Sequence, residues 1–177
     1  MVMKFETIAD IYDGNAKVRQ RLKDLLSSLT DEQVSAAREG ELWNVAEIVE
    51  HIAIVDESTL KICAKLLKKA EAAGQAANSV KISDGFMSKS REIAAMKVEA
   101  PDFVKPTGER SIEESIARLD ENADRAAELR AKFETIDGTS FTFPHPFFGE
   151  ITAHEWFALK GGHELRHLKQ IERLLEQ

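Results

Sequence analysis

The sequence predicts an all-α fold, a four-helix bundle in which one connection is a long crossover. Apolar residues recur at steps of three and four along four stretches of the 177-residue chain, which is the spacing of one face of an α-helix. Three of the four stretches begin with a pattern that caps a helix, and none shows a convincing strand alternation. Because about 100 to 200 residues form one domain, we expect residues 1–177 to be a single domain.

The first two helices follow from apolar spacing and one capping signal. A helix is expected over about residues 4–29, where the apolar side chains share one face. The second helix begins after Asn44, whose side chain can cap the first turn while Glu47 binds back to the cap. It runs to about Ala73, where the following glycine ends it.

The middle of the chain is irregular. Prolines and glycines interrupt residues 74–109, so we expect a long connection there, with a short helix over residues 86–97. The third helix begins at Ser111, whose capping box includes Glu114, and runs to about Phe133.

The last part of the chain combines an aromatic segment with the fourth helix. Residues 139–149 hold four phenylalanines around Pro144 and Pro146, and the two prolines favour a rigid, extended loop. The fourth helix begins at Thr152, with Glu155 completing its capping box, and continues to about Leu175.

Composition excludes several classes of protein. With 24 Lys plus Arg against 31 Asp plus Glu, the net charge is −7, which disfavours a nucleic-acid partner. The single cysteine, Cys63, cannot form an internal disulfide and is typical of a reducing compartment. No apolar run approaches the roughly 18 residues of a membrane span, and the first residues do not resemble a signal peptide. We therefore expect a soluble, cytoplasmic protein with no membrane partner.

Three histidines are candidate metal ligands. His163 and His167 are four residues apart on the fourth helix, so both imidazoles project from the same face and can bind one ion. They lie in or beside the apolar stripe together with Lys160 and Glu164, which predicts a polar cavity inside the bundle. His51, at the flank of the second helix's stripe, can supply a third ligand.

These polar residues have two interpretations. Three neutral imidazoles leave an open position on a metal, as catalytic sites do, and without a set of thiolates zinc or nickel is the expected ion. The alternative is a hydrogen-bonded polar core without metal, with an ion pair between Lys160 and Glu164.

Other reactive side chains have simpler interpretations. His145, between two prolines, is predicted to be part of a rigid turn, with a catalytic role as the alternative. His154, near the start of the fourth helix, is expected on the surface. Cys63 is expected to be a small buried residue rather than a nucleophile.

Four fragments together match one known family. They are WNVAEIVEH (43–51), KPTG (105–108), HPFFGEITAHEW (145–156) and GHELRHLKQI (162–171). In these four fragments the chain resembles the DinB/YfiT superfamily of metalloenzymes, and the resemblance covers nearly the whole chain. The resemblance implies an up-up-down-down four-helix bundle that holds a metal with three histidines, matching His51, His163 and His167. Relatives include hydrolases, and also S-transferases and isomerases that use low-molecular-weight thiols. Many relatives are homodimers.

These observations support two hypotheses about function. In the first, the protein is an enzyme whose divalent ion activates a water or a low-molecular-weight thiol, for hydrolysis or S-transfer on a small-molecule substrate. Glu164 or His145 would then move the proton. In the second, the chain is a non-catalytic metal-binding or stress-associated bundle. From the resemblance we also expect a homodimer.

Overall fold

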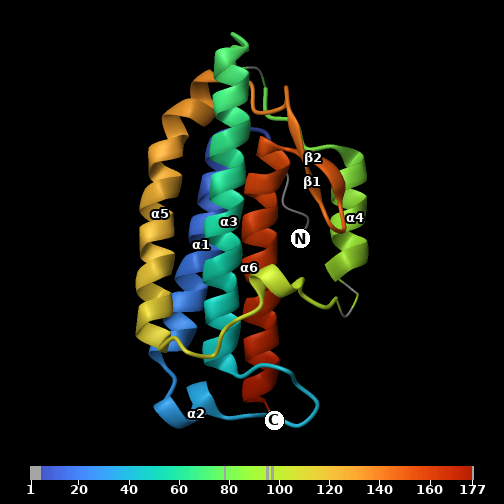
Figure 1. Ribbon diagram of the computed structural model, residues 1–177. Helices are drawn as coiled ribbons and strands as arrows, with labels where there is room; N and C mark the ends of the chain where they lie inside the picture. The colour runs from blue at the N-terminus through green and yellow to red at the C-terminus, as the bar shows by residue number, and fades with distance from the viewer. Residues whose placement is uncertain (1–4, 78, 95, 97, 177) are drawn as a thin grey trace.

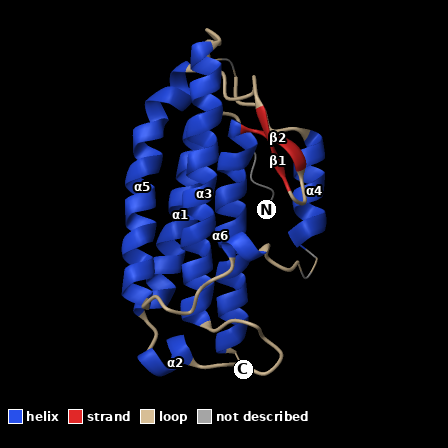
Figure 2. Ribbon diagram, in the orientation of Figure 1, coloured by secondary structure: helices blue, strands red, loops and turns tan. Residues whose placement is uncertain are grey.

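The computed structural model describes residues 5–77, 79–94, 96 and 98–176, and it is built on four long helices. These are α1 (Ile8–Ser27), α3 (Val45–Ala72), α5 (Ile112–Thr135) and α6 (Ala153–Leu175) (Figures 1 and 2). The helix α3 packs against both α5 and α6, and α1 packs mainly against α6. The predicted all-α four-helix bundle is therefore confirmed. Within the described residues, no helix is both long and apolar enough to cross a membrane.

The helix directions differ from the order that the resemblance implied. Asn15 and Arg19 of α1 contact Phe157 and Glu164 of α6 in the same chain order, so these two helices are parallel. The helices α3 and α5 are also parallel to each other and antiparallel to the first pair (Figure 1). The order is up-down-down-up rather than up-up-down-down. Within the described residues, the connection from α3 to α5 is the only one that crosses the length of the bundle, whereas an up-up-down-down bundle needs two such crossovers.

Capping boxes define where the long helices begin. Each N-cap side chain accepts a hydrogen bond from the N3 backbone, and the N3 side chain accepts one from the N-cap backbone. The three predicted boxes, at Asn44, Ser111 and Thr152, are confirmed. A fourth box at Thr7, which we did not predict, starts α1 at Ile8, four residues later than expected. Lys4 lies outside the described residues.

Smaller elements lie in the connections. The helix α2 (Asp31–Ser35) follows α1, and α4 (Asp84–Ala94) is the short helix expected over residues 86–97, shifted toward the N-terminus. Of that expected range, residues 95 and 97 are not among the described residues. A 3-10 turn, η1 (Asp102–Val104), leads back to α3.

The aromatic segment is a β-hairpin, which corrects the expected loop. Strand β1 (Thr142–His145) pairs antiparallel with β2 (Gly149–Thr152), in a register that places Phe143 opposite Ile151. The prolines favoured a loop, yet a two-stranded ribbon has only edge strands, where a proline removes no ladder hydrogen bond from a neighbour. Gly149 has a φ of 72°, which closes the turn in a conformation that favours glycine. The hairpin lies beside the start of α6 and α4 (Figure 1).

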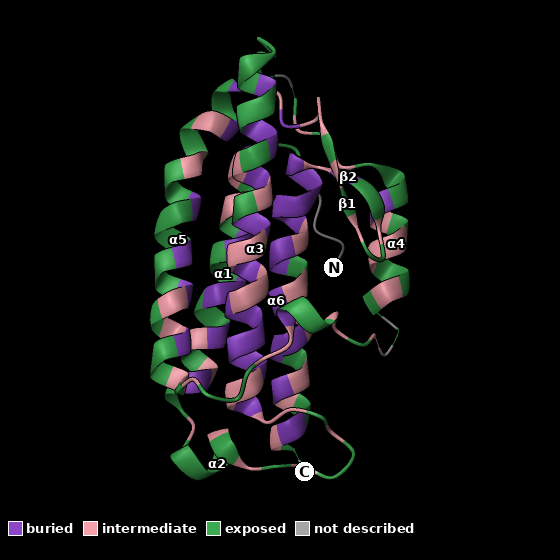
Figure 3. Ribbon diagram, viewed as in Figure 1, coloured by how far each residue is buried: buried purple, intermediate pink, exposed green. Residues whose placement is uncertain are grey.

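The core has two apolar clusters with a polar layer between them. One cluster includes Leu67, Phe133 and Phe157, and the other includes Ile48 and Ile171. Along α1, α3 and α6 the buried residues between the clusters include five polar ones: Asn15, Arg19, Asp56, Lys160 and Glu164. Figure 3 shows that the buried side of each long helix faces its neighbours. The candidate histidines lie at the boundary of this polar layer.

Candidate metal centre

The three predicted ligands lie together. His51 Nε2 is 3.1 Å from His163 Nε2, and His167 Nε2 is 3.2 Å from the same atom. One ligand atom from each residue lies within 4.8 Å of the others. The antiparallel packing of α3 and α6 produces this convergence, because it brings His51 opposite two residues that are one turn apart.

Hydrogen bonds orient two of the rings toward the centre. The Nδ1–H group of His51 donates to the backbone carbonyl oxygen of Val104 at 2.7 Å. That of His167 donates to Gln170 Oε1 at 2.9 Å. A neutral imidazole whose Nδ1 carries the proton has its lone pair on Nε2, which is the arrangement that oxygen partners enforce around metal-bound histidines. Both lone pairs therefore face His163 Nε2.

The donor set is compatible with a divalent ion. A proton on His163 Nε2 can be donated to the Nε2 lone pair of only one neighbour, His51 or His167. The Nε2 lone pair of the other neighbour would then face His163 without a hydrogen bond. Two imidazole ligands on a tetrahedral zinc ion, each with a Zn–N distance of about 2.0–2.1 Å, lie about 3.3 Å apart. The observed separations of 3.1 and 3.2 Å are close to that value.

Burial keeps the three rings neutral at pH 7. It lowers the pKa of His51 below the usual 6.5 and that of His163 well below it. Burial and the neighbouring His51 lower the pKa of His167 to about 3. Neutral imidazole is the form that binds a metal, so the protein already holds the ligands in their binding state.

The three rings differ in how far they are exposed to solvent. His51 and His167 are buried, whereas His163 is partly exposed. The ring of Trp43 covers His51, with 4.8 Å between ring centroids. The solvent side of the cluster is therefore at His163.

The crossover segment is fastened to α3 next to His51. Buried Glu50 accepts hydrogen bonds from Thr107 Oγ1 at 2.7 Å and from the Gly108 backbone at 3.0 Å. The fragment at residues 105–108 thus serves to hold the crossover on α3, which also places the Val104 carbonyl against His51.

A buried ionic network lies beside the cluster. Both carboxylate oxygens of Glu164 accept hydrogen bonds from Arg19, which also binds Asp56 at 2.8 Å. Lys160 pairs with Asp56 at 3.2 Å, so the expected pair between Lys160 and Glu164 does not form. Sequence reasoning missed Arg19 and Asp56. The signal was present for Arg19, which lies on the apolar face of α1 between Val18 and Leu22.

His145 lies on the hairpin, close enough to His163 to influence the pKa of that ring. Its ring packs against Phe148 and Trp156, and its Nδ1 accepts the Phe147 backbone N–H at 3.1 Å. The neutral ring therefore carries its proton on Nε2. Burial lowers the pKa of His145 to about 4.

The structure corrects one prediction and confirms another. His154 is only 1% exposed rather than on the surface, because Gly138 and the ring of Phe133 pack directly against it. Neither ring nitrogen of His154 has a hydrogen-bond partner. Cys63 is fully buried as expected, and burial raises the pKa of its thiol, which makes it unreactive.

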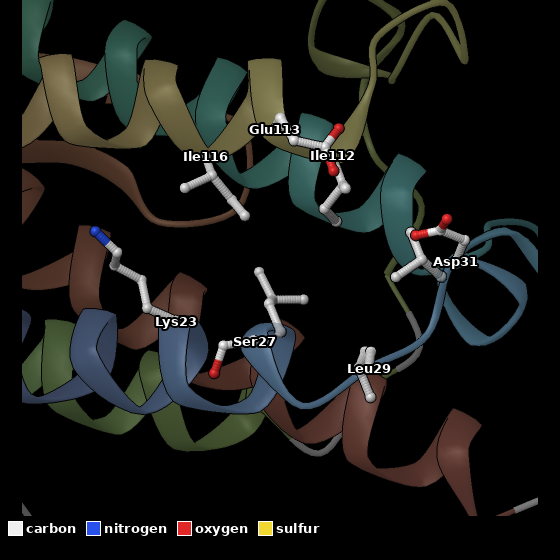
Figure 4. A pocket seen from close by; sticks show the side chains of 9 residues that line it. Lys23, Ser27, Leu29, Asp31, Ile112, Glu113 and Ile116 are labelled. Carbon is white, nitrogen blue, oxygen red and sulfur yellow. The ribbon is translucent and has the colours of Figure 1, made fainter.

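Two surface pockets flank the bundle. One, of about 340 Å³, lies between the end of α1, α2 and the start of α5, and none of the three histidines lines it (Figure 4). The other, of about 450 Å³, lies between α4, the segment that follows it and the turn of the hairpin.

Fold and site together define a class: helical-bundle proteins that gather three histidines from two neighbouring helices around one point. The sequence profile of the DinB superfamily matches residues 16–171, and the chain belongs to that family. It is similar to the uncharacterized protein YuaE of Bacillus subtilis, with 24% identity over 152 residues, which are 86% of this chain and 89% of YuaE. The crystal structure of TT2238, described as a four-helix bundle protein, has 26% identity and a TM-score of 0.61, covering 93% of this chain and 98% of that one.

Proposed function

We propose that His51, His163 and His167 bind one divalent ion, zinc or nickel, and that the protein is a metal-dependent enzyme acting on a small molecule. The observation that carries the proposal is the convergence of three Nε2 atoms, two of them on rings whose Nδ1–H groups are held by oxygen acceptors. An ion on three neutral imidazoles keeps an open position and lowers the pKa of a bound water or thiol, which supplies a nucleophile near neutral pH. The reaction class is hydrolysis or S-transfer.

The protein's own residues supply orientation and proton handling. The partly exposed side at His163 admits the substrate, while Trp43 shields His51 from water. His145 is the proposed hydrogen-bond donor to the substrate, because its Nε2 carries the proton in the neutral ring. Glu164, with both oxygens bound to Arg19, holds α6 in its orientation rather than moving a proton.

Metal-dependent turnover tests this proposal. Chelator-stripped protein is reloaded with zinc or nickel and assayed with mercaptoethanol plus chlorodinitrobenzene for S-transfer, and with nitrophenyl acetate for hydrolysis. We expect turnover that the stripped protein lacks and that reloading restores. His163→Ala should abolish it, whereas Lys23→Met, a surface change remote from the cluster, should leave it intact.

A metal-loaded protein that is inert with every thiol, haloarene and ester tested would contradict the catalytic part of the proposal. Metal binding without turnover would favour the non-catalytic metal-binding bundle.

A further inference from the structure

Arg166 is a cation beside the histidine cluster that has no anionic partner among the described residues. It lies on α6 between His163 and His167, and its guanidinium donates to the backbone oxygens of Ile93 at 3.2 Å and Met96 at 3.1 Å. A guanidinium has five N–H donors, so three remain. Arg19 and Arg118, by contrast, both bind carboxylates.

The charge of Arg166 is not neutralised within the described residues, because both of its hydrogen bonds go to uncharged backbone oxygens. Its side chain is only partly exposed. A partly desolvated guanidinium in this position favours an anion from outside the chain.

A pocket of about 450 Å³ adjoins the segment that Arg166 binds. Ile93 and Met96, whose backbones bind the guanidinium, line it together with Val98, Pro146 and Phe147. Its other lining residues are charged: Lys89 pairs with Glu92 at 2.9 Å, and Glu99 pairs with Lys105 at 3.2 Å. Neither Arg166 nor any of the three histidines lines this pocket. Its volume lies within the range of small-molecule sites, about 300–1,000 Å³. Met96 and Phe147 are 52% and 38% exposed, so an apolar ligand would cover surface that now faces water. The hairpin that forms one wall also carries His145.

We propose that the substrate is an apolar carboxylate, with its carboxylate bound by Arg166 and its apolar body in this pocket. This inference rests on the proposed function, because it names the substrate class of the same site. A single guanidinium matches the single charge of a carboxylate and its two oxygens. A phosphate dianion would need a second cation, and the lysine of the pocket, Lys89, is already paired with Glu92 at 2.9 Å.

Fluorobenzoate and fluorobenzamide are the test probes, since they share a ring and differ in charge. Their dissociation constants are measured by fluorine NMR on both chelator-stripped and zinc-loaded protein. We expect the acid to bind about tenfold more tightly than the amide in both states, because only the carboxylate forms charge-assisted hydrogen bonds with Arg166. Arg166→Gln should bring the acid-to-amide ratio close to one, and Arg166→Lys should keep part of the preference.

Two further variants separate this role from alternatives. Arg173→Gln removes the same charge from the exposed last turn of α6 and should leave the ratio unchanged. Phe147→Ala should weaken acid and amide equally. Equal binding of the two probes to the wild-type protein, or an unchanged acid-to-amide ratio in Arg166→Gln, overturns the inference. The role of Arg166 would then be structural, namely to hold the end of α4 and Met96 against α6. Zinc content is measured on the same samples, which separates the two proposals. A protein that binds no zinc but still prefers the acid would refute the metal site and leave the carboxylate site supported.

Discussion

His51 Nε2 and His163 Nε2 lie 3.1 Å apart, although the two residues are separated by 112 positions in the chain. The contact depends on the register between α3 and α6, because a shift of one residue would turn either ring by about 100° around its helix. The residues that hold this register therefore support the cluster without touching it.

Gly161 and Gly162 are adjacent on α6 and should respond oppositely to alanine. A Cβ at Gly161 would collide with the side-chain oxygen of Asn15, which anchors α1 to the Phe157 carbonyl oxygen. A Cβ at Gly162 meets nothing. We expect Gly161→Ala to lower the free energy of unfolding by about 1–3 kcal/mol through overpacking. Gly162→Ala should raise it by up to about 1 kcal/mol through helix propensity.

Urea unfolding followed by circular dichroism measures both changes. Equal effects of the two substitutions would show that α1 and α6 do not approach as closely as the structure indicates.

Arg19 should be far more important for stability than a surface cation on the same helix. The side chain of Arg19 is only 10% exposed, and its guanidinium is paired with Asp56 and Glu164. Arg19→Met leaves two buried carboxylates with only Lys160 nearby, so we expect a loss of about 3–5 kcal/mol in the free energy of unfolding.

Lys23→Met is the matched control, because Lys23 pairs with Asp120 on the surface of the bundle. An exposed pair contributes less than about 1 kcal/mol. A loss for Arg19→Met no larger than that for Lys23→Met, measured by urea unfolding, would contradict the buried network.

His154 should make stability depend on pH. Burial lowers its pKa below the usual 6.5, an effect that Asp137 and Glu155 only partly offset. Below pH 6.5 the unfolded chain binds a proton that the folded protein excludes, so the stability present above that pH is lost as the pH falls. His154→Phe removes this effect and keeps a ring against Phe133.

The free energy of unfolding of His154→Phe, relative to wild type, should therefore increase toward low pH. The increase should reach at most about 1.4 kcal/mol per pH unit. Urea titrations at about pH 7.5 and about pH 5.5 measure it. A difference that stays constant with pH would mean that His154 titrates alike in both states.

The sequence predicts the local features of this molecule well. Capping boxes at Asn44, Ser111 and Thr152 are complete within four residues, so they can be recognised without knowledge of the fold. The grouping of His51 with His163 and His167 was also accessible, because helical spacing and stripe position place all three rings at the edge of the core.

Features that depend on packing between helices could not be predicted in the same way. The partner of Glu164 lies on α1, and apolar spacing within one helix does not reveal which residue of another helix will face it. The same is true of the Val104 carbonyl, which reaches His51 from the crossover. In the hairpin, the prolines obscured the alternation of Thr142 with the phenylalanines beside it. The expected homodimer stays a prediction that light scattering can test.

The metal content of the purified, untagged protein tests the central claim most directly. After incubation with zinc or nickel and removal of the excess, elemental analysis should find about one ion per chain, as expected for a single three-histidine site. His51→Ala, His163→Ala and His167→Ala should each lose most of it while far-UV helicity persists, because the apolar clusters carry the fold. A wild-type protein that retains no ion, or a triple variant that retains as much as wild type, would contradict the assignment of these histidines as a metal centre.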